Sequence, residues 1–311
     1  MIIDELWQYP VKGLGGVTLA EARLQAGTHF PGDRRFAVTN GHPRNADMAA
    51  GQWRKKALFL QLMSNERLAA LECSFSGSRL VIREQGEEHL DVDLDTADGA
   101  AAAGAFFTAF CGDAIAGPAT LTRIDAGAFT DTEAPWISLG GTASVAQVAT
   151  TFGHLPDARR YRLNIMLKTE TPFEEARLIG HRVALGDAVL KVVEPVGRCA
   201  AIDVDPDNGV RGRHLLPDME RAFGHTDLGI FAEVEDSESF YHGYAPTSEL
   251  VQVAFDVDYS ESTSIEFGIQ HQTTDSIQVP GWTRVTQDLV DNGTYITGSP
   301  DSRNDASNPI G

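Results

Sequence analysis

The residue best placed for chemistry in this sequence is Cys199, which lies in the run EPVGRCAAIDVDPDNG at 194–209. It follows a predicted strand and a Pro–Val–Gly turn, a place where side chains are exposed at the end of a strand. Arg198 beside it supplies a positive charge, which favours the thiolate, the form of cysteine that binds metals and acts as a nucleophile. Cys73 and Cys111 fall in a predicted strand and at the end of a predicted apolar helix, so we expect them to be packing residues.

Basic side chains form the second candidate group, because they occupy turns and strands of a chain that is otherwise strongly acidic. Each one alone is more typical of a solvated surface charge. Together with the cysteine motif they indicate an anion site, since Arg and Lys bind phosphate oxygens through charge-assisted hydrogen bonds. The group consists of Lys12, Arg34, Arg35, Arg162 and Arg198.

Other catalytic motifs are missing from the sequence. It contains no HExxH, no Cys/His zinc spacing, no GxxxxGK[ST] and no GxSxG. The GLGG run at 13–16 lies between two predicted strands, whereas a dinucleotide site needs it at the start of a helix. His225 with Asp227, and the acidic run at 203–209, are better explained as a loop and a turn than as metal sites.

Composition limits the possible partners. The 311 residues are 42% hydrophobic and 22% charged, which is an ordinary globular composition for one large or two medium domains. The 25 basic and 44 acidic residues give a net charge of −19, which repels phosphate backbones and anionic lipids, so nucleic acid and membrane surfaces are disfavoured as partners. The chain has three cysteines, no run of about 20 apolar residues and an N-terminus unlike a signal peptide. From these features we expect a soluble cytoplasmic protein.

Hydrophobic patterning predicts a mostly β protein of the α+β class with few short helices. The predicted strands cover residues 2–9, 17–24, 35–40, 68–75, 78–84, 89–94, 161–168, 181–186, 188–195 and 229–235. The predicted helices cover 99–110, 142–152 (with Thr142 or Ser144 as a cap) and 217–223. The acidic residues 256–311 are predicted to hold one or two strands and a disordered end from about residue 298.

Four separate runs, in this order, resemble the motifs of MOSC-domain proteins of the amidoxime-reducing type and their bacterial relatives. They are LWQYPVKGLGG followed by PGDRRFAV (6–38), YRLNIML (161–167), VVEPVGRCAAIDVDPDNG (192–209) and FGHTDLGIFAEV (223–234). This sequence departs from the family at Gly13, where a serine is common, and at Leu163, where a proline is usual. The resemblance covers about residues 1–235.

The resemblance implies a MOSC β-barrel at 115–255, preceded by a MOSC-associated β-barrel-like domain at 1–114, with the site in the cleft between them. Residues 256–311 are then an acidic extension without a ferredoxin domain. The implied cofactor is the molybdenum cofactor, with Cys199 as the protein's metal ligand. The residues implied to hold the cofactor and its phosphate are Lys12, Arg34, Arg35, Arg162, Asn164 and Arg198.

The activity that the resemblance implies is removal of oxygen from N-hydroxylated or N-oxide-type small molecules. No cysteine follows Cys199, so a built-in iron–sulfur domain is excluded and electrons must come from a separate reductase or ferredoxin. Two alternatives stay open. Cys199 could carry a persulfide in sulfur transfer, or the protein could be a non-catalytic carrier of the cofactor.

Overall fold

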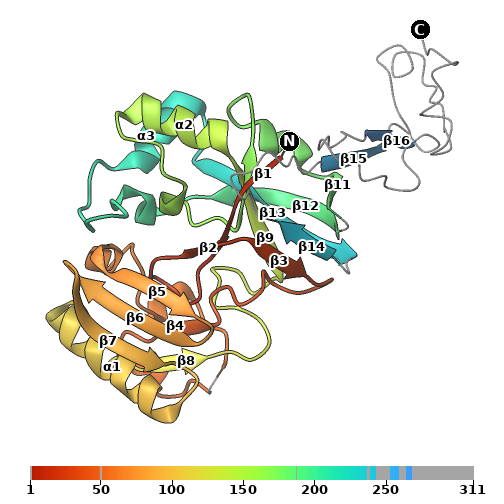
Figure 1. Cartoon of the computed structure of the whole chain (residues 1–311). Helices are drawn as coiled ribbons and strands as arrows, with labels where there is room; N and C mark the ends of the chain where they lie inside the picture. Colours follow the sequence, from red (N-terminus) through yellow and green to blue (C-terminus); the bar gives the residue numbers. More distant parts are fainter. Residues whose placement is uncertain are drawn as a thin grey trace, which may run out of the picture.

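The computed structural model describes residues 2–49, 51–186, 188–236, 239–242, 253–258 and 264–267. Strands dominate this part of the chain, and three α-helices accompany them (Figure 1), which confirms the predicted mostly-β α+β class. The helices are α1 (Ala97–Cys111), α2 (Thr142–Phe152) and α3 (Leu215–Phe223). The strands are β1 (Ile2–Gln8), β2 (Val17–Leu19), β3 (Glu21–Leu24), β4 (Phe36–Val38), β5 (Glu72–Ser76), β6 (Arg79–Glu84), β7 (Glu87–Asp93), β8 (Leu121–Arg123), β9 (Trp136–Gly141), β10 (Ile165–Lys168), β11 (Arg182–Leu185), β12 (Ala188–Gly197), β13 (Asp227–Asp236), β14 (Ser239–His242), β15 (Val253–Asp258) and β16 (Ser264–Phe267).

Nine strands form one large sheet in the order β16-β15-β11-β12-β13-β9-β10-β1-β2. All its pairings are antiparallel except that of β9 with β10. Among the described residues no pairing joins the two ends of this order, so the sheet is open. The first strand of the chain lies inside this sheet, where Ile2 of β1 pairs with Lys168 of β10.

Alternation along the central strands decides which face of the large sheet is buried, because successive side chains of a strand point to opposite faces. Ile230, Ala232 and Val234 of β13 are buried, and the residues between them are half-buried. Leu190 of β12 pairs directly with Val234, and both belong to the main hydrophobic cluster. This pattern explains why the sequence predicts strands here.

Residues 36–124 form a smaller body beside the large sheet (Figure 1, orange to yellow). It contains the sheets β5-β6-β7 and β4-β8, with α1 packed against them. Helix α1 begins after Thr96, whose hydroxyl accepts a hydrogen bond from the Gly99 backbone N–H at 3.0 Å, as in a standard N-cap. Its buried Ala103 and Phe107 join the second hydrophobic cluster. The helix predicted at 99–110 is therefore confirmed.

Three predicted strands differ in the structure. The segment 17–24 is divided into β2 and β3, which belong to different sheets. The segment 68–75 contains the 3-10 helix η3 (Glu66–Ala70) before β5 begins, because a short apolar run does not distinguish a helical turn from a strand. The segment 161–168 becomes a strand only at Ile165. Arg162 has a φ of 57°, outside the range of any strand, and it delays the start of β10.

Helix α2 has the predicted bounds, but its predicted cap is wrong. Its N-cap residue is Gly141, which has no side chain to accept a hydrogen bond. The Thr142 hydroxyl instead accepts from the backbone N–H of Thr169, and the Ser144 hydroxyl donates to the buried Glu175. These hydroxyls join α2 to neighbouring segments, which sequence spacing alone does not reveal. Helix α3 confirms the helix predicted at 217–223.

The close approach of two central strands makes Gly229 hard to replace, and Gly229→Ala should lower the free energy of unfolding by about 1–3 kcal/mol. Its φ is 89°, and an added Cβ would lie 2.6 Å from the Leu139 carbonyl oxygen in β9. Gly86→Ala is the matched control, with a φ of 82° and nothing within 4 Å of an added Cβ. Equal losses for both variants in urea unfolding would contradict the role of the close approach.

Strands β15 and β16 lie at the start of the acidic end of the chain. The end predicted to be disordered from residue 298 lies outside the described residues, and the predicted domain boundaries after residues 114 and 255 stay predictions. No helix in the described part of the chain is long and apolar enough to cross a membrane.

Candidate functional site

Cys199 lies directly after β12, at the point where the chain leaves the large sheet. The backbone N–H of Arg198 donates to the Thr226 carbonyl at 3.1 Å, and Cys199 then begins the 3-10 helix η7 (Ala200–Asp203). Its own carbonyl accepts from the Ile202 N–H at 3.1 Å. The side chain of Cys199 is half-buried. The thiol is therefore held on a fixed turn at a strand end, open to a small ligand.

The Arg198 guanidinium turns back into the protein and is held by carbonyl groups alone. It donates to the Tyr161 carbonyl at 2.6 Å and to the Leu228 carbonyl at 3.3 Å. Its Nε is buried and has no hydrogen-bond partner among the described residues. Burial lowers the pKa of Arg198, which the neighbouring Cys199 partly offsets. The half-buried Arg198 donates only to carbonyl groups and forms no ion pair with a carboxylate among the described residues.

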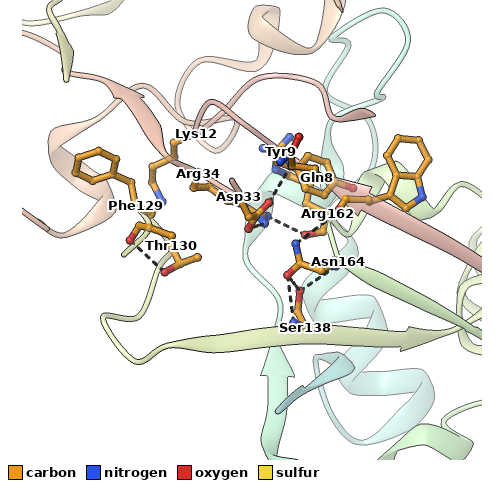
Figure 2. Close-up of polar contacts among 12 residues, drawn as sticks. Gln8, Tyr9, Lys12, Asp33, Arg34, Phe129, Thr130, Ser138, Arg162 and Asn164 are labelled. Carbon is orange, nitrogen blue, oxygen red and sulfur yellow. Dashed lines mark hydrogen bonds and ion pairs between the residues drawn. The ribbon is translucent and has the colours of Figure 1, made fainter. Parts of the chain in front are cut away.

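Two further guanidinium groups lie against the ring of Tyr9 (Figure 2). The Arg34 guanidinium is 4.6 Å and that of Arg162 is 4.4 Å from the ring centroid. Arg34 forms an ion pair with Asp33 and donates to the Arg162 carbonyl at 2.8 Å, while Arg162 donates to the Leu14 carbonyl. Burial, and then the charge of Arg34, lowers the pKa of Arg162 to about 10. Both arginines adopt positive φ, of 44° and 57°, which is rare for a residue with a side chain.

Lys12 and Lys56 converge on one carboxylate. The Lys12 Nζ is buried and donates to the Phe129 carbonyl at 2.8 Å and to Asp131 at 2.7 Å (Figure 2). Lys56 donates to the other Asp131 oxygen at 2.8 Å. Burial lowers the pKa of Lys56, but the charge of Asp131 and then the nearby Cys199 outweigh it and raise that pKa. Lys56 comes from the smaller body and Cys199 from the segment after β12, so the two segments approach each other here. Sequence reasoning missed Lys56 and Asp131, because neither belongs to a recognisable motif.

Asp131 is held ionised by these lysines. Burial would raise the pKa of Asp131, but the charges of Lys12 and Lys56 outweigh it and hold the pKa well below its ordinary value. Asp131→Asn should lower the free energy of unfolding at pH 7 by about 1 kcal/mol. This value is near the low end for hydrogen bonds to charged groups, because the Asp131 side chain is 51% exposed.

The pH dependence of this loss is fixed in sign. The folded pKa of Asp131 lies below its unfolded value, so its contribution is complete above about pH 4 and is lost as the pH falls further. The stability difference between wild type and Asp131→Asn, measured by urea unfolding, should shrink below about pH 4. A constant difference between neutral and acid pH would contradict this. Asp125→Asn is the control, because the Asp125 side chain pairs with Arg123 and is 75% exposed.

The structure does not bring Arg35 to this group. Its guanidinium forms two hydrogen bonds of 3.0 Å with Asp95 at the protein surface, where Arg123 binds the same carboxylate. Asn164 is near the group but its side chain is already used. It accepts from the Ser138 hydroxyl at 2.9 Å and donates to the Trp7 carbonyl at 3.3 Å, which ties β1 to β9.

Both departures from the family motifs fit their surroundings. Gly13 has a φ of 85°, and an added Cβ would lie 2.9 Å from the Leu60 carbonyl oxygen, so a serine does not fit this backbone. The buried Leu163 side chain fills the space above Gly140, whose added Cβ would lie 2.3 Å from it. Local packing therefore accounts for glycine and leucine at these two positions.

A cavity of about 230 Å³ lies between the smaller body and the segments that follow α2. It shares Tyr9 and Arg162 with the cluster of cations, and Cys73 and Ala201 also line it. The Tyr9 hydroxyl and the Arg160 Nε are buried without a hydrogen-bond partner among the described residues. Unpartnered buried donors next to a cavity are typical of sites that hold a polar ligand.

Positive charge therefore exceeds negative charge at this site, in a chain whose net charge is −19. Its cations are Lys12, Lys56, Arg34, Arg162 and Arg198, and its carboxylates are Asp33 and Asp131. No group of three or more His, Cys, Asp or Glu side chains in the described residues could hold a metal by itself. The fold and site define a mostly-β protein with a group of cations and one thiol where its two bodies meet.

The chain belongs to the MOSC-domain proteins. Residues 1–118 match the MOSC N-terminal beta barrel domain, and residues 132–244 match the MOSC domain. No curated protein matches the chain.

Two solved bacterial structures are similar to parts of it. The YuaD protein from Bacillus subtilis is 10% identical, with a TM-score of 0.34, over 78% of this chain and 90% of that one. YiiM from Geobacillus stearothermophilus is 22% identical, with a TM-score of 0.27, over 37% of this chain and 52% of that one.

Proposed function

We propose that this chain is a molybdenum-cofactor-binding oxidoreductase that reduces N-hydroxylated or N-oxide-type small molecules, with electrons from a separate reductase or ferredoxin. MOSC domains are associated with this cofactor in general. The observation that supports the proposal most is the excess of positive charge, on one buried and four half-buried side chains, near the Cys199 thiol. An excess of this kind stabilises a bound anion and is unfavourable without one.

The residues fit the chemical groups of this cofactor. Its phosphate is a multiply charged acceptor, and the guanidinium groups of Arg162 and Arg198 have no carboxylate partner among the described residues. Guanidinium groups bind phosphate oxygens in pairs of parallel hydrogen bonds. The thiolate of Cys199 is a soft ligand, which suits a metal already bound by the sulfurs of the pterin.

Each residue then has a defined task. Arg162 and Arg198 hold the phosphate, with Arg34 beside them. Lys12 donates the N–H that Phe129 and Asp131 leave free. Cys199 provides the protein's bond to the metal. When bound, the cofactor supplies the two-electron redox chemistry. Conversion of an N–OH group to N–H with release of water takes two electrons and two protons, and Lys56 holds a proton at Nζ beside the Cys199 sulfur.

The test is metal content together with turnover. The protein is expressed in a host that makes the cofactor, and molybdenum and phosphorus are measured by elemental analysis. Turnover is followed with dithionite-reduced viologen, using an amidoxime and an aromatic N-oxide as substrates. We expect close to one molybdenum per chain and oxidation of viologen that depends on the substrate.

The alternatives give different results in the same experiment. A non-catalytic carrier retains molybdenum and shows no turnover with either substrate. A sulfur-transfer protein lacks molybdenum and carries a persulfide on Cys199, which mass spectrometry detects as an added sulfur atom. Either result would replace the proposed activity.

A further inference from the structure

The turn that follows Cys199 makes a second connection between the large-sheet side of the molecule and the smaller body. Residues 203–212 fold back on themselves, with a bridge between Val204 and Arg211. The backbone N–H of Asp205 donates to the Val210 carbonyl at 2.9 Å, and that of Gly212 to the Asp203 carbonyl at 2.8 Å. The turn is therefore a rigid unit attached to the C-terminal end of η7.

Arg211 extends from this turn to both sides of the interface. One guanidinium nitrogen donates to the carbonyl of Ala200, the residue after Cys199, at 2.9 Å. The other donates to the carbonyls of Leu62 and Met63 in the smaller body, each at 3.0 Å, and approaches Glu66 at 3.3 Å. A single side chain thus connects the backbone beside the thiol to the smaller body.

Gly209 brings the same turn into direct backbone contact with η3 of the smaller body. An added Cβ would lie 2.9 Å from the Glu66 carbonyl oxygen and 3.2 Å from the Arg67 Cα. Gly209 also has a φ of 69°, which favours glycine. Two independent features therefore hold the turn against η3. They are the hydrogen bonds of the Arg211 guanidinium and the close backbone contact at Gly209.

We infer that Gly209 and Arg211 are positioning residues, which hold the backbone at Cys199 in place by fastening the 203–212 turn to the smaller body. The carbonyl next to Cys199 is bound by the same guanidinium that is anchored on Leu62 and Met63. Loss of the fastening releases the thiol-bearing turn while the two bodies keep their own cores.

This inference rests on the proposed function only for the role of Cys199. Its test uses the cofactor-free chain. Cys199 alkylation by iodoacetamide is timed and located by mass spectrometry, and hydrogen exchange is measured for peptides covering 199–204. Arg211→Met and Gly209→Ala should each speed both processes about tenfold, as expected when one charge-assisted contact that limits local opening is lost. The alkylation rate at Cys111, which ends α1 and does not line the cavity, should not change.

Matched controls separate positioning from general destabilisation. Arg79→Met removes an arginine paired with Asp91 on the surface of the smaller body. Gly153→Ala imposes the same backbone cost at a φ of 75°, where nothing lies within 4 Å of an added Cβ. Both should leave alkylation and exchange at Cys199 at wild-type rates.

Arg211→Lys covers the case in which Arg211→Met does not fold. It keeps the charge but cannot reach Ala200 and Leu62 together, so it should show most of the increase. Wild-type rates in Arg211→Lys and Gly209→Ala, or equal increases in the two controls, would overturn the inference. Neither result bears on molybdenum content, so the proposed function is judged separately.

Discussion

Replacing Cys199 with alanine should abolish the proposed reduction of N-hydroxylated compounds, because the proposed protein ligand of the metal is lost. The cations Arg34, Arg162 and Arg198 are untouched, so pterin should still bind while molybdenum falls well below one per chain. Cys199→Ser replaces the sulfur with an oxygen ligand. The absorption spectrum of the bound metal should shift, since oxygen donates less charge than sulfur. Turnover with reduced viologen and elemental analysis are measured on each variant.

Cys73→Ser and Cys111→Ser are the matched controls. Burial raises the pKa of Cys73 to about 12 and also raises that of Cys111, which favours the protonated thiol at both positions. Each should cost about 1 kcal/mol of stability, for a hydroxyl in place of a thiol, and leave metal and turnover unchanged. If Cys199→Ala keeps wild-type molybdenum, spectrum and turnover, the ligand assignment is wrong.

Arg162→Ala should have the next largest effect, a loss of cofactor during dialysis with the fold intact. The phosphate would lose a charge-assisted partner worth about 1.5–3 kcal/mol, which corresponds to roughly a tenfold to hundredfold weaker retention. Molybdenum and phosphorus per chain are measured before and after dialysis, and the melting temperature reports on the fold. The Leu14 carbonyl also loses its donor, so a small decrease in melting temperature is expected.

Arg35→Ala is the control for this variant, and it also tests a residue that the family resemblance places at the site. Arg35 neighbours Arg34 in sequence, but its guanidinium is bound to Asp95 at the surface. Its removal should leave molybdenum occupancy at the wild-type level. Equal retention in Arg162→Ala and Arg35→Ala after dialysis would contradict the phosphate assignment.

Sequence patterns predict local structure here where a single period is clear. Helix α2 begins and ends where predicted, and β12 and β13 are close to their predicted bounds, because their apolar residues repeat at one interval. The start of β10 was missed, since it depends on the left-handed backbone of Arg162. A tertiary contact with Tyr9 and Leu14 holds that backbone, and local propensity contains no information on it.

The site was predictable only in part, for a similar reason. Cys199, Arg198 and Arg162 lie in short motifs whose residue types suggest their chemistry. Lys56 and Asp131 are brought to Cys199 by the docking of two bodies, so no spacing in the sequence marks them. Asn164 is fully engaged in joining β1 to β9, and the motif cannot distinguish such a structural amide from a ligand-binding one.

The pairing of β1 with β10 also sets the order in which the protein folds. During synthesis β1 leaves the ribosome before β10, its partner on one side, which contains Lys168. The smaller body, residues 36–124, lies between them in sequence. It supplies all of the second hydrophobic cluster except Val11 and Leu14, so we expect it to form while β1 is still unpaired. Contacts so distant in sequence close slowly. Arg34 reaches Arg162 only after that closure. We therefore expect assembly of the site to be one of the last events in folding, and binding of the proposed cofactor to follow it.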